Sequence, residues 1–105
     1  MRFALTCAAV FAMTAATAHA QDADTEAGKS LYAGKCAQCH GKEGQGMAIF
    51  PSLQGRDADY IASRLKTYRA GEKVGANSGV MIANAKGLSD DDIRNLAAYI
   101  SSNFK

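Results

Sequence analysis

Apolar residues recur at helical spacing in three stretches of the chain, and glycine-containing segments separate these stretches. The stretches are residues 25–36, residues 57–70 and the residues that follow Ser89. The residues expected to face the interior are Ala27, Leu31 and Tyr32 in the first, Ile61, Leu65 and Tyr68 in the second, and Ile93, Leu96, Ala97 and Ile100 in the third. No stretch shows the sustained alternation of a strand, so the pattern predicts an all-α domain with three main helices.

Local signals mark the limits and contacts of these helices. Gly28 lies on the apolar side of the first helix, where a glycine lowers helix stability, and this indicates a close approach by another element. Gly71 is placed to end the second helix. At residues 89–92 the sequence Ser-Asp-Asp-Asp provides a capping serine and an acidic residue three positions later, with negative charges that suit a helix N-terminus. These aspartates are therefore interpreted as a helix start and not as a metal site.

Two segments between the predicted helices, residues 41–55 and residues 71–87, are interpreted as loops of about 15 residues each. Connections of that length are uncommon in a small domain, and they usually carry function. Both segments are therefore interpreted as functional loops.

Residues 1–20 have the pattern of a secretory signal peptide. Arg2 supplies an early positive charge, an alanine-rich apolar run follows, and Ala18-His19-Ala20 provides the small-residue pattern that signal peptidase recognises. The run is too short, and too often interrupted by threonine, for the roughly 20 apolar residues of a membrane span. The sequence therefore predicts export, cleavage and a mature domain at residues 21–105 without stable membrane insertion.

Removal of the signal peptide leaves Cys36, Cys39 and His40 as the only cysteines and the only histidine of the mature chain. Eleven basic residues then stand against ten acidic ones, and this balance gives no polybasic surface for nucleic acid. Alanine is the commonest apolar residue, and there is no tryptophan. Small domains often need a disulfide, a metal or a cofactor to be stable, so a group other than side chains is expected to fill the centre.

The pentapeptide Cys36-Ala37-Gln38-Cys39-His40 permits several kinds of chemistry. A thioredoxin-like dithiol needs a preceding strand and a parallel sheet, and neither is visible. A zinc site needs a fourth ligand, which would have to be a carboxylate because no other thiol or imidazole remains. Covalent haem attachment needs only what is present, since two thiols at this spacing can form thioethers and the adjacent imidazole then lies beside the iron. A plain disulfide remains open as an alternative.

Further motifs follow the pentapeptide along the chain. They are Pro51-Ser52-Leu53, Met81, Leu88-Ser89-Asp90-Asp91-Asp92-Ile93 and Leu96-Ala97-Ala98-Tyr99-Ile100. With these motifs in this order and spacing, the chain resembles the small class I monohaem cytochromes c of bacteria, over essentially the whole mature chain from Ala27 to its end. The resemblance implies the cytochrome c fold, in which helices and loops wrap around one covalently bound haem c with its iron.

The resemblance also implies a role for each residue of the site. Cys36 and Cys39 would carry the thioether bonds to the haem, and His40 would be the proximal ligand of the iron. Pro51 would offer its backbone carbonyl to the other nitrogen of the His40 ring, which would fix the ring and its tautomer.

Two methionines remain in the mature chain, Met47 and Met81. Met81 is at the family position of the distal ligand and lies far enough along the chain to reach the other face of the haem. It is therefore the expected distal ligand of the iron, while Met47 would be a flexible filler of the haem cleft. The resemblance also implies that Gly28 crosses the last helix near Leu96 and Tyr99.

Electron transfer is the function that these roles imply. Two protein ligands leave no open position on the iron for oxygen or peroxide, so the chain is expected to be an electron carrier of the bacterial periplasm and not an enzyme. Its partners would be redox proteins, with a donor such as a quinol-oxidising complex and an acceptor such as a terminal oxidase or reductase. Lys35, Lys42 and Lys86 are candidate contacts for such partners. The alternative function is a haem-based sensor or small peroxidase in which Met81 dissociates.

Overall fold

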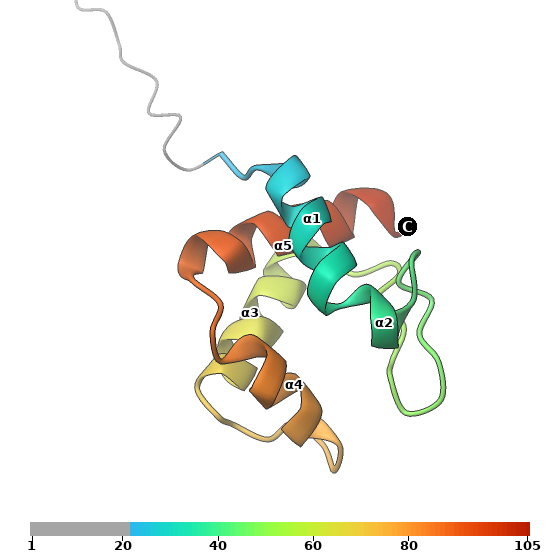
Figure 1. The fold of residues 1–105 in the computed structure, drawn as a ribbon, viewed down its shortest axis with the longest axis vertical. Helices are drawn as coiled ribbons and strands as arrows, with labels where there is room; N and C mark the ends of the chain where they lie inside the picture. The colour runs from blue at the N-terminus through green and yellow to red at the C-terminus, as the bar shows by residue number, and fades with distance from the viewer. Residues whose placement is uncertain (1–21) are drawn as a thin grey trace, which may run out of the picture.

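Five helices form the described part of the chain, residues 22–105, in a computed structural model (Figure 1). In chain order they are α1 (Thr25–Lys35), α2 (Ala37–His40), α3 (Ala58–Arg69), α4 (Ser78–Ala85) and α5 (Asp90–Asn103). Over this range the β-structure is limited to an isolated bridge between Met47 and Phe50, so the predicted all-α class is confirmed. The signal peptide predicted for residues 1–20 lies outside the described residues. None of the helices within residues 22–105 is long and apolar enough to cross a membrane.

Helices α1 and α5 cross in contact at Gly28, as the sequence predicts. A Cβ atom at Gly28 would lie 2.6 Å from the carbonyl carbon of Asn95 and 2.9 Å from Cβ of Tyr99, so no side chain fits there. A hydrogen bond adds to this contact, because the backbone N–H of Asp24, the N-cap residue of α1, donates to Asn95 Oδ1 at 2.8 Å. The glycine therefore permits an approach of two helix backbones that any side chain would prevent.

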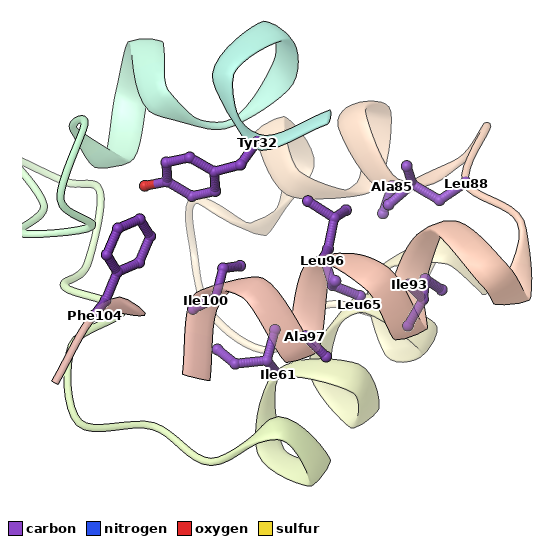
Figure 2. Close-up of a cluster of buried hydrophobic side chains, with 10 residues drawn as sticks. All are labelled: Tyr32, Ile61, Leu65, Ala85, Leu88, Ile93, Leu96, Ala97, Ile100 and Phe104. Atoms are coloured by element: carbon purple, nitrogen blue, oxygen red, sulfur yellow. The ribbon is translucent and has the colours of Figure 1, made fainter. Parts of the chain in front are cut away.

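The hydrophobic core lies where α1 and α3 pack against α5 (Figure 2). Its buried side chains are Tyr32, Ile61, Leu65, Ala85, Leu88, Ile93, Leu96, Ala97, Ile100 and Phe104. The predicted interior sides of the three main helices are confirmed, although Ala27, Leu31 and Tyr68 are only partly buried. Each fully buried large aliphatic side chain stabilises the fold by about 1.5–3 kcal/mol, and α5 supplies the largest share of them.

The ends of α3 and α5 follow the signals in the sequence. At the start of α3 the side chain of Asp57 accepts a hydrogen bond from the Tyr60 N–H at 2.7 Å, and after its end Gly71 has a φ of +82°. At the start of α5 Ser89 Oγ accepts from the Asp92 N–H at 3.0 Å, and Asp92 Oδ2 accepts from the Ser89 N–H at 3.0 Å. This reciprocal pair is the predicted capping box.

Residues 71–87 are not the continuous loop that the sequence suggests, because residues 78–85 form α4. The sequence gives little sign of this helix, since Asn77 at its N-cap makes no side-chain hydrogen bond and Gly79 lowers its intrinsic stability. The helix is stabilised instead by packing against α3 and by the complete burial of Ala85. The loop interpretation of these eight residues is therefore wrong.

Candidate functional site

A cavity of about 380 Å³ lies among α2, α3, α4 and α5. Its volume falls within the range of about 300–1,000 Å³ that is typical of cofactor and ligand sites. Most of the residues that line it are apolar, and the core helices supply several of them. Four of the five predicted site residues also line this cavity: Cys36, His40, Pro51 and Met81. The cavity is therefore the candidate functional site.

Two segments of the chain, far apart in the sequence, contribute residues to the lining of this cavity. We call α2 together with residues 41–55 the histidine side, and residues 71–87, which include α4, the methionine side. Figure 1 shows α2 and the loop after it at one edge of the fold and α4 at another. His40 belongs to the first segment and Met81 to the second, so the structure brings the two predicted axial ligands to one cavity.

The orientation of His40 is fixed by the backbone of the histidine side. The side chain is buried, with an exposed fraction of 5%, and its Nδ1 lies 2.8 Å from the carbonyl oxygen of Pro51. Because a carbonyl oxygen can only accept, Nδ1 carries the proton, and Nε2 keeps its lone pair for a metal ion. The Phe50 ring stands edge-on to the imidazole, with 6.2 Å between ring centroids. The hydrogen bond expected between Pro51 and His40 is thus present in the structure.

Residues 41–55 fold back on α2, and this return brings Pro51 to His40. The N–H of Gly46 donates to the carbonyl oxygen of His40 at 2.7 Å, which closes the turn. Gly46 has a φ of +77°, and a Cβ atom there would lie 2.7 Å from the backbone nitrogen of Ser52. A side chain at this position would strain the turn and push the Pro51 segment away from the imidazole.

Tyr32 on α1 anchors the start of the same loop. Its hydroxyl donates to the carbonyl oxygen of Gly41 at 2.6 Å, and its exposed fraction is 2%. Burial raises the pKa of the Tyr32 phenol to about 12, so the group remains a donor at neutral pH. Its ring packs on Phe104 and Tyr99, with centroid distances of 4.9 and 5.7 Å, as Figure 2 shows for Phe104. The residue that follows His40 is therefore held by α1 and α5.

The two thiols of the pentapeptide lie in different surroundings. Cys36 lines the cavity, and burial raises the pKa of its thiol to about 11. Cys39 is half-buried and is not among the residues that line the cavity. Both thiols are free, so the structure contains no disulfide between them. Within residues 22–105 no group of three or more His, Cys, Asp or Glu side chains could hold a metal ion, which leaves the zinc alternative without a ligand set there.

The two methionines within residues 22–105 differ in exposure. Met81 is half-buried on α4, packs against the core and lines the cavity. Met47 is 49% exposed and does not line the cavity. Its backbone is paired with that of Phe50 in a tight turn, with N–H to carbonyl distances of 3.0 and 2.8 Å. The expectation that Met47 fills the cleft is therefore wrong.

Two arginines of the site were not predicted from the sequence. Among residues 22–105, Arg56 and Arg64 are the charged residues that line the cavity, and no acidic residue does so. Their guanidinium carbons lie 4.8 and 5.4 Å from the centroid of the Tyr60 ring. Tyr60 and Arg64 lie four residues apart on α3, and this spacing could have indicated a shared helix face, whereas Arg56 precedes the helix and its sequence position gave no such signal. A cavity with apolar walls and two guanidinium groups suits a ligand that has an apolar body and anionic groups.

The site thus offers an imidazole nitrogen, a thioether, a thiol, apolar walls and two cations around one cavity. Haem c fits this set, because it has an apolar ring, two carboxylates, a metal that accepts axial ligands and attachment points for thiols. The fold and the site together define the class of small helical proteins with a covalently attached haem.

Comparisons with known proteins agree with this class. The sequence model of the family described as cytochrome c matches residues 25–104. The chain is 48% identical over 80 residues to cytochrome c-554(548) of Halomonas halodenitrificans. This alignment covers 75% of this chain and 95% of that relative. The chain is also 39% identical over 87 residues to cytochrome c-554(547) of Halothiobacillus neapolitanus, in an alignment that covers 75% of this chain and 96% of that relative.

A solved structure supports the fold as well. The cytochrome c4 of Acidithiobacillus ferrooxidans is similar with a TM-score of 0.64 at 30% identity, over 74% of this chain and 48% of that chain. Our chain thus spans about half the length of that protein. The chain belongs to the cytochrome c family, and the predicted cytochrome c fold is confirmed. Its cofactor is covalently bound haem c with iron, and it functions as an electron carrier, with no support for a sensor or peroxidase.

Proposed function

We propose that this cytochrome c carries single electrons in the bacterial periplasm and is not itself an enzyme. Residues 1–20 would direct its export and then be removed, and residues 21–105 would form the working domain. The composition of the first segment supports export, and the match to the cytochrome c family over residues 25–104 supports the extent of the domain.

Four side chains would hold the haem. Cys36 and Cys39 would form the thioether bonds, His40 would be the proximal ligand of the iron, and Met81 would be the distal ligand. When bound, the haem supplies a reversible one-electron couple. One observation carries this proposal: His40, with Nδ1 already hydrogen-bonded, and Met81 line the same largely apolar cavity.

The role of Pro51 would be to orient the proximal ligand through its backbone. Its carbonyl accepts the Nδ1–H of His40 at 2.8 Å, which selects one tautomer and one ring orientation. The same hydrogen bond makes the imidazole a stronger electron donor at Nε2. Because His40 is also buried, bulk water has little access to this ligand.

Met81 would complete the ligand set from the methionine side. A thioether is a soft ligand, and in an apolar pocket it favours the reduced metal more than a second imidazole does. With an imidazole on one side and a thioether on the other, no position is left for a substrate. The proposed ligand set therefore suits a carrier better than a catalyst.

Arg56 and Arg64 would bind the two carboxylates of the haem. They line the cavity, and guanidinium groups bind carboxylates in a fork geometry with two hydrogen bonds. Neutralised in this way, the carboxylates would add little net charge to the mouth of the cavity. The partner surface would then depend on the other side chains around it.

The proposed partners are redox proteins, with a donor such as a quinol-oxidising complex and an acceptor such as a terminal oxidase or reductase. Four large apolar side chains line the cavity and are also exposed, which suits a small contact surface: Ile49, Tyr60, Val74 and Val80. Transient redox complexes are small and depend on rapid encounter more than on buried area. A partner that contacts this apolar rim would lie close to the cofactor.

Intact mass spectrometry of the denatured protein tests the covalent attachment. The mass should exceed that of residues 21–105 by one haem, which would also locate the cleavage site. Cys36→Ala and Cys39→Ala should each weaken the attachment, while Ser101→Ala on α5, which lies outside the cavity lining, should not. Release of all haem into acidified organic solvent from the parental protein would contradict the proposal.

A further inference from the structure

Ser78, the first residue of α4, is buried to an unusual degree for a hydroxyl side chain. Its exposed fraction is 6%, and within residues 22–105 the buried polar side chains are Ser78 and His40. Both residues line the cavity, one on the methionine side and one on the histidine side. His40 has an evident role, whereas no feature of the sequence drew attention to Ser78.

The side chain of Ser78 closes the segment that precedes α4. Its Oγ accepts hydrogen bonds from the N–H groups of Val74 and Gly75, at 2.9 and 2.8 Å. Its own N–H donates to the carbonyl oxygen of Gly75 at 3.2 Å. We call residues 74–77 the strap; they are exposed to solvent on one side and line the cavity on the other. Three hydrogen bonds to one serine thus hold the strap over the cavity.

Met81 lies three residues after Ser78 and therefore on the same face of α4. Among the side chains that begin this helix, Asn77 makes no capping hydrogen bond, so the hydroxyl of Ser78 supplies the side-chain restraint at this end. The other end of α4 is held by the buried residues Ala85 and Leu88. Any movement of the strap would therefore be passed to the turn of α4 that carries Met81.

We propose that Ser78 is a positioning residue for Met81: by closing the strap over the cavity, its hydroxyl keeps the thioether on the iron. The inference rests on the proposed role of Met81 as the distal ligand. Without the hydroxyl, the N–H groups of Val74 and Gly75 lose their acceptor, and solvation of these groups favours an open strap. An open strap gives Met81 more freedom and makes its dissociation faster.

Imidazole binding to the oxidised holoprotein tests this inference. At saturating imidazole the binding rate is limited by dissociation of Met81, and loss of two hydrogen bonds should raise that rate about tenfold in Ser78→Ala. The methionine-to-iron charge-transfer band should weaken in parallel. Ser101→Ala removes a partly buried serine hydroxyl that donates to the Ala98 carbonyl and is not part of the cavity lining, and it should leave both readouts at parental values.

The outcomes separate this inference from the assignment of Met81. If the parental protein shows the band but Ser78→Ala binds imidazole at the parental rate, Ser78 does not position the ligand. If the parental protein lacks the band and binds imidazole rapidly, Met81 is not the distal ligand. The role proposed for Ser78 is then wrong as well.

Amide hydrogen exchange on the parental protein gives a second test that needs no variant. The N–H groups of Val74 and Gly75 should exchange more slowly than those of Ala76 and Asn77, for which the described chain offers no hydrogen-bond acceptor. Saturating imidazole should then remove this protection, because displacement of Met81 loosens the strap. Protection that is absent from the start, or that imidazole leaves unchanged, would overturn the inference.

Discussion

The histidine side and the methionine side of the cavity are held in place by different means. On the histidine side, hydrogen bonds connect the loop to other elements: the Tyr32 hydroxyl bonds the Gly41 carbonyl at 2.6 Å, and the Gly55 N–H bonds the Phe104 carbonyl at 3.0 Å. The loop is thus fastened to α1 at its start and to the C-terminus of α5 at its end. The proposed proximal ligand lies within a framework that includes the hydrophobic core.

On the methionine side, the hydrogen bonds are mostly local. Those of Ser78 stay within the strap and its neighbouring helix. A longer connection occurs at the far end, where Arg69 donates to the Leu88 carbonyl at 3.2 Å and to the Asp90 carboxylate at 2.7 Å. This hydrogen bond and the positive charge of Arg69 lower the pKa of Asp90, but both groups lie at the surface.

The difference indicates where the ligand set is stable and where it can change. A ligand that is fastened to the core dissociates only when part of the fold opens, whereas a ligand on a locally closed segment can leave while the core stays intact. We therefore expect that changes on the histidine side affect folding and haem loading, and that changes on the methionine side affect ligand exchange.

The largest effect should come from His40→Ala. This change removes the proposed proximal ligand and leaves the Pro51 carbonyl without its donor, so the histidine side loses its link to the haem. We expect the yield of haem-loaded protein to fall to about a tenth of the parental yield or less. The ratio of haem absorbance to total protein in cell extracts measures this. An unchanged ratio would contradict the role of His40.

Met81→Ala should have the next largest effect, and mainly on ligand binding. If the thioether leaves the iron in about 0.1–10% of parental molecules, its removal should increase imidazole affinity by about 10- to 1,000-fold. Thermal unfolding should change much less than in His40→Ala. Met47→Ala is the matched control, because Met47 is exposed and does not line the cavity, and its affinity should remain parental. The reverse result for the two methionines would show that the distal ligand is Met47.

Tyr32→Phe should lower the free energy of unfolding at neutral pH by about 1 kcal/mol, the usual contribution of one hydrogen bond. The pH dependence is more specific. Because burial raises the pKa of Tyr32 from 10.0 to about 12, the unfolded chain ionises at lower pH than the folded chain. The contribution of this group is therefore constant below pH 10 and decreases as the pH rises from 10 toward 12.

Urea unfolding at a series of pH values measures this difference. The stability advantage of the parental protein over Tyr32→Phe should shrink as the pH rises above 10. Parallel curves for the two proteins would show that Tyr32 does not ionise in this way, and that other contacts hold the start of the loop.

Charge reversal at Lys35, Lys42 and Lys86 should have the smallest effect. All three side chains are exposed, and none lines the cavity. Electron transfer with the natural partner should slow by less than about tenfold at low salt, and the difference should shrink as ionic strength rises. The haem spectrum serves as the control and should not change.

Single reversals would then show which side the partner contacts, since Lys35 and Lys42 flank α2 and Lys86 follows α4. If even the triple variant exchanges electrons at the parental rate in dilute buffer, the contact lies on the exposed apolar residues around the cavity.

The main helices could be predicted because their signals are local. The capping box that begins at Ser89 and the glycine at Gly71 depend on a few neighbouring residues, and Gly28 could be interpreted from its place on an apolar stripe. The thiols and imidazole of the site were also evident, since they occur within five consecutive residues. The hydrogen bond of Pro51 was expected from the family resemblance alone.

Other features depend on contacts that no short segment contains. Helix α4 is stabilised by burial of Ala85 and by α3, so its own sequence gave little indication of it. The exposure of Met47 follows from positive φ angles on both sides of it, +77° at Gly46 and +49° at Ala48, and only the first is at a glycine. The positioning role proposed for the Ser78 hydroxyl depends on a cavity that forms only in the folded chain, so the sequence alone gave no sign of it.

The crossing of α1 and α5 also bears on the order of helix docking and haem attachment. The hydrogen bond between Asp24 and Asn95 joins positions 71 residues apart, so the two helices can dock only when nearly the whole chain is available. Until then, Cys36 lacks the core against which it packs in the folded protein, and its thiol is open to the solvent. We therefore expect haem attachment to be fastest on the unfolded chain and to slow once the last helix has docked.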